Sequence, residues 1–352
     1  MTGDWQYGMK SSLIQTLTQF WRETYNFNVA EERLNHLPHA RIYINDFAIS
    51  YVHIKGVGAH RTPLLLLNGW PSSFVEYSKL AGQLTQQGAR VDCAAESFDI
   101  VIPAFPGFGY SERPTRPHQV DTEDMFHILM TEGLGYSRYW VSGTDIGAGV
   151  ATRLALKFPQ AVQGIHISSV VDPTLGDDSP PLTDAERVYR SSCAEWASQE
   201  GAYEHLHYTR PQTLAFALAD SPVGLASWIL DKFHSWTDHD DDLFQVFPPE
   251  VLIDNLMVYW ATETIGSSMR YYYDALHYRE SLAREDRVTV PTAVCMWPKD
   301  LVTAPIEWAQ RFYNVQQYTL QVHGGHFPAW EAPEVYAADL RSFTHSTRDI
   351  YE

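Results

Sequence analysis

Apolar and polar positions along the start of the chain predict two helices followed by a hairpin. Segments 12–25 and 29–37 carry apolar residues at the spacing of amphipathic helices. Residues 39–56 instead hold two runs in which apolar and polar side chains alternate, separated by Asn45 and Asp46. Asn and Asp favour tight turns, so we expect two antiparallel strands joined at this point.

Beyond this hairpin, predominantly apolar runs alternate with amphipathic segments. "PLLLL", "FDIVIP", "RYWVS" and "GIHISSVV" indicate strands covered on both faces, and a helix follows each of the first three. The alternation stops after Asp172, a mainly helical stretch occupies about 183 to 285, and the alternation returns at 288–297. We predict an α/β fold with a mostly parallel sheet, helices on both faces and an inserted helical cap. The predicted boundaries are an N-terminal segment at 1–60, a core at 61–172 and 287–352, and a cap at 173–286.

Composition narrows the partners and the compartment. The 352 residues carry a formal net charge of -18 without a basic cluster, which argues against nucleic acid or an anionic membrane as partner. Cys93, Cys193 and Cys295 lie far apart, so we expect no disulfide framework, no metal site and no other cofactor, in a reducing cytoplasm. The first residues lack an apolar run long enough for a signal peptide or membrane anchor, so we expect a soluble protein. The sequence leaves a homodimer open.

The octet "SGTDIGAG" places Asp145 between a predicted strand and a predicted helix. Glycines flank it as they flank the serine of the G-x-S-x-G elbow, where a tight turn raises the nucleophile above the sheet edge. Gly143 and Gly147 tolerate such a turn, and the start of the helix stabilises negative charge. Asp is also a good helix cap, so the octet alone leaves an N-cap and a nucleophile equally open.

A histidine and a second carboxylate stand where a catalytic triad requires them. His326 in "VHGGHFPAW" lies between the last strand and the last helix, and His323 is its rival nearer the strand end. Asp300 in "CMWPKDLVTAP" follows a strand, and Asp172 after "HISSVV" is the alternative acid. We predict a triad of Asp145, Asp300 and His326, in which the acid orients the histidine and stabilises its charged form.

An aspartate nucleophile restricts the substrate. A carboxylate attacks saturated carbon to give an alkyl ester, so the substrate is an epoxide or carries a carbon–halogen bond. His326 then activates water against the ester, and backbone N–H groups of Trp70, in "LNGWP", and Ile146 stabilise the oxyanion, although "NGWP" is also a plain turn sequence. Haloalkane dehalogenases usually place a Trp after the nucleophile to hold halide. Ile146 therefore favours an epoxide. Tyrosine hydroxyls of the insertion can protonate the oxygen of the epoxide.

These residues together resemble the α/β-hydrolase epoxide hydrolases of microsomal and juvenile-hormone type. The similarity runs from "FWRETYNF" to "LRSF", and its more specific parts are "TRPQTLAFALADSPVGLASWILDKFHSWT" and "NLMVYWATETIGSSMRYYYD". The resemblance implies an α/β-hydrolase fold, gives the triad the same roles, and matches Tyr203 and Tyr272 to the two epoxide-activating tyrosines. By spacing alone, Tyr208 rivals Tyr203, and Tyr271 and Tyr273 rival Tyr272.

Departures from the family pattern concern the oxyanion loop and the elbow. Asn68 stands where the family usually has the His of His-Gly-x-Pro, and Ile146 stands where Trp is frequent. The anchor of the mammalian microsomal enzymes is missing, so the resemblance implies a soluble, bacterial form. Trp228 and Trp236 in the cap indicate a bulky or aromatic epoxide, as in secondary metabolism. We predict an epoxide hydrolase that makes vicinal diols; a dehalogenase and a non-catalytic ligand-binding scaffold are the alternatives.

Overall fold

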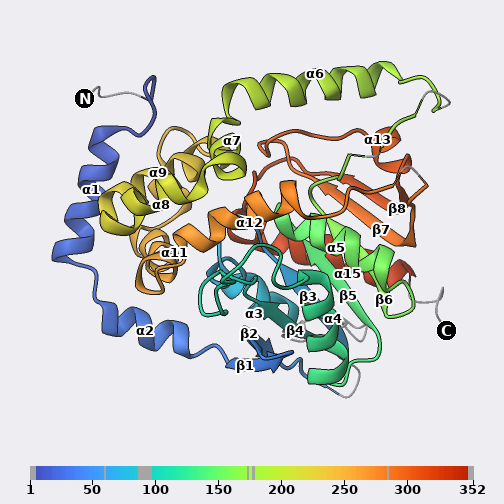
Figure 1. The fold of residues 1–352 in the computed structure, drawn as a ribbon, viewed down its shortest axis with the longest axis horizontal. Helices are drawn as coiled ribbons and strands as arrows, with labels where there is room; N and C mark the ends of the chain where they lie inside the picture. Colours follow the sequence, from blue (N-terminus) through green and yellow to red (C-terminus); the bar gives the residue numbers. More distant parts are fainter. Residues whose placement is uncertain are drawn as a thin grey trace.

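The described part of the chain is built on one eight-stranded sheet (Figure 1). The computed structural model describes residues 5–58, 61–85, 97–172, 174–176, 179–283 and 285–347; Cys93 and residue 173, the first of the predicted cap, lie outside them. The strands are β1 (His39–Ile44), β2 (Phe47–Ile54), β3 (Arg61–Leu67), β4 (Ser97–Pro103), β5 (Tyr139–Gly143), β6 (Val162–Ile167), β7 (Val288–Met296) and β8 (Tyr313–Leu320). Their order across the sheet is β1-β2-β4-β3-β5-β6-β7-β8.

Most of the sheet is parallel, as predicted. Every neighbouring pair from β4 to β8 runs parallel, whereas β2 is antiparallel to both β1 and β4. In the turn between β1 and β2, Asn45 and Asp46 have φ values of 50° and 64°, which these short polar residues tolerate better than most. The predicted hairpin therefore forms the edge of the core sheet rather than a separate unit.

Helices cover both faces of the sheet. On one face α3 (Ser78–Thr85) packs against α15 (Pro333–Thr347), with α14 (Pro328–Glu331) beside them. On the other face α4 (Thr122–Ile128) packs against α5 (Ile146–Lys157), and α13 (Ile306–Gln310) contacts β8. Because both faces are covered, Leu64 to Leu67 on β3 are fully buried, which explains the unbroken apolar run in the sequence.

Two predicted helices depart from α-helical geometry at one end. The segment expected to be helical from residue 74 starts as a 3-10 turn, η1 (Phe74–Tyr77), where the Ser73 side chain accepts a hydrogen bond from the Val75 N–H. The segment after α4 continues as a π-helix, η2 (Leu129–Gly133), and Gly135 at φ 77° follows it. Both departures occur at an end of a helix, where the sequence pattern is least informative about helix geometry.

Seven helices of the described residues lie between β6 and β7 and are called the helical insertion below. They are α6 (Asp184–Gln199), α7 (Ala202–Thr209), α8 (Pro211–Asp220), α9 (Pro222–Trp236), α10 (Leu243–Val246), α11 (Pro249–Ala261) and α12 (Ile265–His277). The N-terminal helix α1 (Ser11–Glu23) contacts α9 and α11, and α2 (Phe27–Asn35) leads from it to β1 (Figure 1). The start of the chain thus bridges the insertion and the sheet.

No single helix in the described ranges has the length and apolar character needed to cross a membrane. The pair α8 and α9 meets that test only when joined, and the two helices meet at a 120° bend.

Candidate active site

Asp145 occupies the tight turn between β5 and α5. Its backbone lies at φ 52° and ψ -127°, a conformation that costs a non-glycine residue energy. A side chain on Gly143 would collide with the backbone of Gly147, and one on Gly147 would collide with the backbone of Leu67 on β3. Although Asp145 directly precedes α5, its side chain makes no capping hydrogen bond to that helix. The geometry supports a nucleophile elbow rather than an N-cap.

The two carboxylate oxygens of Asp145 have different neighbours. The Trp70 backbone N–H donates to Oδ1 at 2.9 Å, and Oδ2 lies 3.4 Å from Nε2 of His326. Gly69 permits the first contact, because a Cβ at that position would overlap the carboxylate. Within the described residues the Ile146 N–H makes no hydrogen bond to this side chain. Oδ1 is therefore held in place, and Oδ2 is the oxygen available for attack.

His326 lies in the loop after β8 and connects two carboxylates. Its Nδ1 lies 2.6 Å from Oδ1 of Asp300, and its backbone N–H donates to the Trp236 carbonyl at 2.8 Å. A carboxylate only accepts, so Nδ1 carries a proton and Nε2 faces Asp145. Burial works to lower the pKa of the His326 ring, but the charges of Asp300 and Asp145 outweigh burial and hold that pKa well above its ordinary value.

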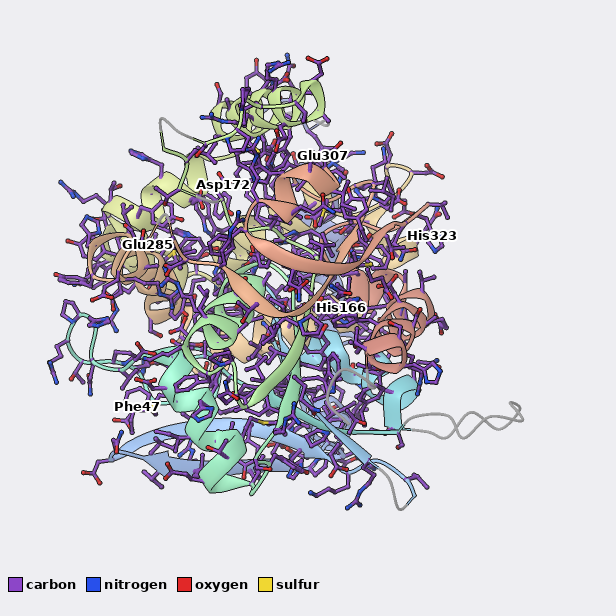
Figure 2. All side chains as sticks on the ribbon, turned by 90° about the vertical axis from the view of Figure 1, so that its right-hand side faces the viewer. Phe47, His166, Asp172, Glu285, Glu307 and His323 are labelled. Carbon is purple, nitrogen blue, oxygen red and sulfur yellow. The ribbon has the colours of Figure 1, made fainter. Side chains whose placement is uncertain are left out.

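The rival acid and the rival histidine lie elsewhere. Asp172 accepts a hydrogen bond from the indole N–H of Trp308 at 3.1 Å. His323 is exposed and lies at the outer edge of the molecule in Figure 2. This placement supports Asp300 and His326 as the acid and the base.

Helix α11 of the insertion holds the loop that carries Trp70. The side-chain amide of Asn255 donates to the Pro71 carbonyl at 2.8 Å, and the Tyr259 hydroxyl donates to the Ser72 carbonyl at 2.7 Å. All of these groups are buried. The insertion therefore fixes the backbone next to the N–H that contacts Asp145.

Two tyrosines of the insertion, one from α7 and one from α12, pack against Trp70, whose N–H contacts Asp145. The rings of Tyr203 and Tyr272 pack against the indole of Trp70, with centroids 5.4 and 6.3 Å away. The Tyr272 hydroxyl is buried and has no hydrogen-bond partner among the described residues. Burial raises the pKa of both phenols well above its ordinary value, and the charge of Asp145 adds to this effect. Both therefore stay protonated and can donate at neutral pH.

The rival tyrosines have other contacts. The Tyr271 hydroxyl accepts a hydrogen bond from Arg279 at 2.9 Å. Tyr273 stacks on His277 with ring centroids 4.0 Å apart, and Tyr208 donates to a glutamate of its own helix at 2.9 Å. Their positions support Tyr203 and Tyr272 as the pair next to the nucleophile.

Comparison with known proteins places this chain in a family. A family model described as the epoxide hydrolase N terminus matches residues 1–77, and one described as the alpha/beta hydrolase fold matches residues 62–333. Epoxide hydrolase 1 of Oryctolagus cuniculus is 32% identical over 367 residues, covering 96% of this chain and 80% of that protein. The chain belongs to the epoxide hydrolases.

Two further similarities agree with this assignment. Juvenile hormone epoxide hydrolase 2 of Ctenocephalides felis is 32% identical over 366 residues, covering 96% of this chain and 78% of that protein. The crystal structure of juvenile hormone epoxide hydrolase from the silkworm Bombyx mori matches with a TM-score of 0.87 at 29% identity, covering 98% of this chain and 87% of that one. The predicted fold, family and epoxide-hydrolase activity are confirmed, and the dehalogenase and binding-scaffold alternatives are set aside.

The two tryptophans of the helical insertion that were expected to bind substrate lie at different depths in this epoxide hydrolase. The ring of Trp236 is 5.2 Å from that of Tyr203 and 5.0 Å from that of His326. The indole N–H of Trp228 instead donates to Nε2 of His207 at 3.3 Å. Trp236 thus touches the triad directly, whereas Trp228 reaches the tyrosines only through His207.

Three titratable side chains near the site, Glu76 and His207 fully buried and Glu331 half-buried, were missed by the sequence prediction. Burial raises the pKa of Glu76 and of Glu331 to about 7, and lowers the pKa of His207 to about 3. No motif marks these residues, since their properties come from burial in the fold. The available signal was the position of His207 four residues after Tyr203, on the same face of one helix.

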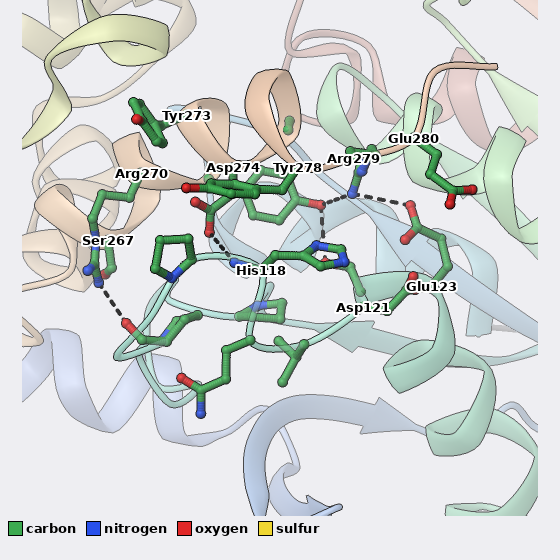
Figure 3. Close-up of a pocket in the computed structure, with 18 of the residues that line it drawn as sticks. His118, Asp121, Glu123, Ser267, Arg270, Tyr273, Asp274, Tyr278, Arg279 and Glu280 are labelled. Carbon is green, nitrogen blue, oxygen red and sulfur yellow. Dashed lines mark hydrogen bonds and ion pairs between the residues drawn. The ribbon is translucent and has the colours of Figure 1, made fainter.

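A cavity of about 920 Å³ is lined by residues of α12, of α4 and of the loop before α4 (Figure 3). Arg270, Tyr273 and Asp274 line it from α12, and Glu123 lines it from α4, where an ion pair joins it to Arg279 at 3.2 Å. None of the predicted catalytic residues is among the described residues that line this cavity. The cavity is therefore separate from the site of Asp145.

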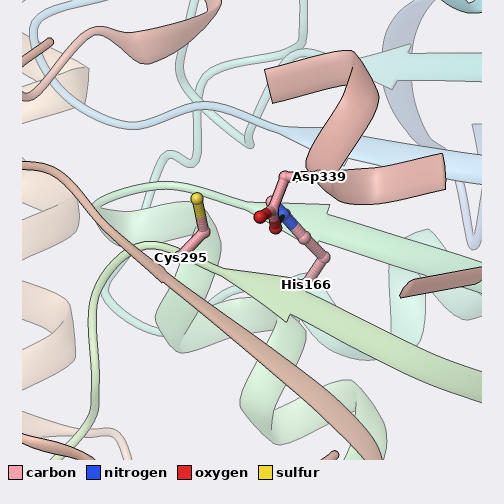
Figure 4. A group of neighbouring side chains, drawn as sticks. All are labelled: His166, Cys295 and Asp339. Atoms are coloured by element: carbon pink, nitrogen blue, oxygen red, sulfur yellow. Dashed lines mark hydrogen bonds and ion pairs between the residues drawn. The ribbon is translucent and has the colours of Figure 1, made fainter. Parts of the chain in front are cut away.

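One buried group in the described ranges has the spacing of metal ligands but not their chemistry. Ligand atoms of His166, Cys295 and Asp339 lie within 4.8 Å of one another (Figure 4). Both nitrogens of His166 are already in hydrogen bonds, Nδ1 with the Ser142 hydroxyl and Nε2 with Asp339, each at 3.0 Å. Burial raises the pKa of the Cys295 thiol well above its ordinary value, which disfavours the thiolate that binds metals. We interpret the group as a structural hydrogen-bond network.

Proposed function

We propose that this epoxide hydrolase opens its substrate through an ester on Asp145. Oδ2 attacks one carbon of the oxirane ring, and the bond between that carbon and the ring oxygen breaks. The oxygen keeps the bonding electrons and takes a proton from Tyr203 or Tyr272, whose raised pKa values keep them protonated until negative charge develops. The product of this step is a hydroxyalkyl ester of the enzyme.

Water then releases a vicinal diol. Nε2 of His326 removes a proton from water as its oxygen attacks Cγ of the Asp145 ester. Oδ1 takes the negative charge, stabilised by the Trp70 N–H that already contacts it and by the N–H of Ile146, next in the chain. The Cγ–Oδ2 bond breaks, and His326 returns its proton to the departing oxygen. The regenerated Asp145 carries the second proton of water and passes it to His326, which restores the carboxylate and the protonated ring of the resting enzyme.

The charge of Asp145 controls when His326 becomes a base. In the resting enzyme, the carboxylates of Asp300 and Asp145 raise the pKa of His326 despite its burial, which favours the protonated ring. The ester carries no charge, so its formation removes one of the two causes of the raised pKa. His326 therefore loses its proton more readily after the first step. The phenolate left by epoxide opening takes that proton, so the tyrosine is restored and His326 is a neutral base when water must be activated.

The observation that carries the proposal is that His326 contacts both Asp145 and Asp300. His326 lies 3.4 Å from Asp145 and 2.6 Å from Asp300. We further propose that the helical insertion is the cap predicted at 173–286. In this view Trp236 and Trp228 favour a bulky or aromatic epoxide, as in secondary metabolism. The homodimer and the cytoplasmic location stay predictions from the sequence.

The experiment that tests this function traps the ester. His326→Gln removes the base but leaves the nucleophile, so incubation with styrene oxide should add the mass of one substrate to the protein. Peptide mapping by mass spectrometry should place the adduct on Asp145. Asp145→Ala should form neither the adduct nor the diol, while circular dichroism checks that both variants fold.

Two results would contradict the proposal. Diol formation by Asp145→Ala at the wild-type rate would remove Asp145 as nucleophile. An adduct on another carboxylate in His326→Gln would move the chemistry to that residue.

A further inference from the structure

Buried polar atoms without hydrogen bonds gather around Asp145. Five of these atoms in the described residues are Nε1 of Trp70 and of Trp236, Nδ1 of His207, the hydroxyl of Tyr272, and Nε2 of His326, which lies 3.4 Å from Oδ2 of Asp145. Their rings form a continuous group, since each lies within 6.3 Å, centroid to centroid, of another ring in the group or of Tyr203. Buried polar atoms normally have partners, so such a group marks the place where a polar ligand binds.

His207 is an imidazole in this group that takes no part in the proposed reaction. It lies on α7 four residues after Tyr203, and its side chain is fully buried. Its ring centroid is 4.7 Å from that of Trp70 and 5.0 Å from that of Tyr272. The imidazole is therefore in contact with both the oxyanion loop and an epoxide-activating tyrosine.

A hydrogen bond from Trp228 fixes which nitrogen of His207 carries the proton. The indole N–H of Trp228 donates to Nε2 at 3.3 Å, and an indole nitrogen cannot accept. Nε2 is therefore the acceptor, and a neutral ring must carry its hydrogen on Nδ1, the atom without a partner. Burial, together with the charge of Lys232, lowers the pKa of His207 to about 3. The ring stays neutral at ordinary pH, so Nδ1–H is a permanent donor rather than a proton-transfer group.

We propose that Nδ1–H of His207 is a specificity-determining donor that binds an acceptor oxygen carried by the substrate beside its oxirane ring. The proposal rests on the proposed function, because it takes Asp145 as the nucleophile. Tyr203 and Tyr272 already supply one donor for each lone pair of the oxirane oxygen. A third donor in contact with Tyr272 therefore serves a second oxygen. The favoured substrates are epoxides with an ether, ester or hydroxyl oxygen one or two bonds from the ring.

Two epoxides of the same length and shape test this inference. Benzyl glycidyl ether has an ether oxygen two bonds from the oxirane ring, and 5-phenyl-1,2-epoxypentane has a methylene group in the place of this oxygen. The wild-type enzyme should have the higher kcat/KM for the ether. His207→Leu should lower kcat/KM for the ether about tenfold more than for the hydrocarbon, because it removes the donor and leaves a ring-sized apolar group. His207→Gln keeps an N–H donor and an acceptor for Trp228, so it should retain the preference.

A purely structural role for His207 gives a different result. If the imidazole only supports the Trp70 ring, His207→Leu slows both epoxides equally, and that outcome overturns the inference. An unchanged preference in His207→Leu, or no preference in the wild-type enzyme, overturns it as well. In these cases ester formation in His326→Gln still upholds the proposed function. If the wild-type enzyme opens neither epoxide and no ester forms, the proposed function fails and the inference fails with it.

Discussion

Three consecutive tyrosines on α12 show how the position of one residue decides its role. Successive side chains on a helix point about 100° apart, so Tyr271, Tyr272 and Tyr273 cannot share one face. Tyr272 is buried against the Trp70 indole, whereas Tyr271 and Tyr273 line the separate cavity in Figure 3. The sequence left the three open because helical spacing gives relative directions but not which direction faces the nucleophile.

Tyr272→Phe should therefore reduce activity in a way that Tyr273→Phe does not. The substitution removes the proposed acid but keeps the ring, so we expect kcat/KM for styrene oxide to fall about 100-fold. Folding should be unaffected, because the Tyr272 hydroxyl has no partner in the described structure. Tyr273→Phe is the matched control and should retain the wild-type value. Steady-state diol formation measures both, and a larger loss in Tyr273→Phe would reassign the donor.

Single residues were predictable where the chemistry needs a local pattern. Asp145 stands between glycines that its turn requires, and His326 stands in a loop that the order of strands and helices defines. His207 was not predictable, because an unpaired Nδ1 exists only once Trp228 donates to Nε2 in the folded protein. Asn68 was noticed as a departure from the family, but its contact, a 3.0 Å hydrogen bond to the Gly69 carbonyl, required the structure.

At the scale of elements, α11 couples the insertion to the oxyanion loop. The helix is largely apolar but carries buried polar groups, and two of these, Asn255 and Tyr259, hold the carbonyls of Pro71 and Ser72. The N–H of Trp70, the residue just before them, stabilises negative charge in the proposed hydrolysis. The geometry of ester hydrolysis thus depends on a helix that contributes no reacting group.

Tyr259→Phe should accordingly impair both stability and ester hydrolysis. Losing the 2.7 Å bond leaves the Ser72 carbonyl buried and unpaired, so the free energy of unfolding should fall by about 1–2 kcal/mol. We expect kcat to fall about tenfold as the oxyanion loop loosens. Tyr25→Phe is the control, since Tyr25 donates to Asp254 of the same helix at 2.9 Å, away from that loop.

The control variant should lose stability and keep its kcat. Chemical denaturation and single-turnover kinetics separate the two effects. If both substitutions lower kcat equally, the loss comes from the stability of α11 and not from the oxyanion loop.

Whole-molecule features were predictable to the extent that they follow from local patterns. Apolar runs defined the strands, and the break after Asp172 defined the insertion, because each reflects burial along a continuous segment. The order of strands was not readable, since pairing of β3 with β4 and β5 depends on how crossover helices pack. The sequence pattern also did not predict the contacts of α1 with α9 and α11, because an apolar stripe on a helix does not show which surface it packs against.

At the scale of the whole molecule, two acids lie close to the triad, Glu76 fully buried and Glu331 half-buried. Glu76 accepts a hydrogen bond from the Ser72 hydroxyl at 2.5 Å, and Glu331 accepts from the backbone N–H groups of Asp238 and Phe327 at 2.8 and 2.9 Å. Burial raises the pKa of each to about 7, from an ordinary value of 4.5. The charges of Asp145 and Glu331 add to the rise at Glu76. Ionisation of these acids therefore links the stability of the molecule to pH.

Stability should fall as pH rises from about 4.5 to about 7, and Glu76→Gln should reduce that fall. Below the lower pH, Glu76 is protonated in both the folded and the unfolded chain, so its contribution is fully present. Between the two values the unfolded chain ionises while the folded protein keeps the proton, and the loss is complete once pH exceeds the folded pKa. A shift from 4.5 to about 7 corresponds to about 3 kcal/mol. Glutamine preserves the acceptor for Ser72 but cannot ionise.

Glu76→Gln should match the wild-type free energy of unfolding at pH 4.5 and exceed it at pH 8 by up to about 3 kcal/mol. Urea unfolding at pH 4.5, 6 and 8 gives the comparison, with Glu31→Gln as a control because Glu31 is exposed. The pH dependence is the diagnostic result, since better packing of glutamine would raise stability equally at every pH. A constant difference between variant and wild type would therefore mean that the pKa of Glu76 is the same in the folded and the unfolded chain, contrary to its burial.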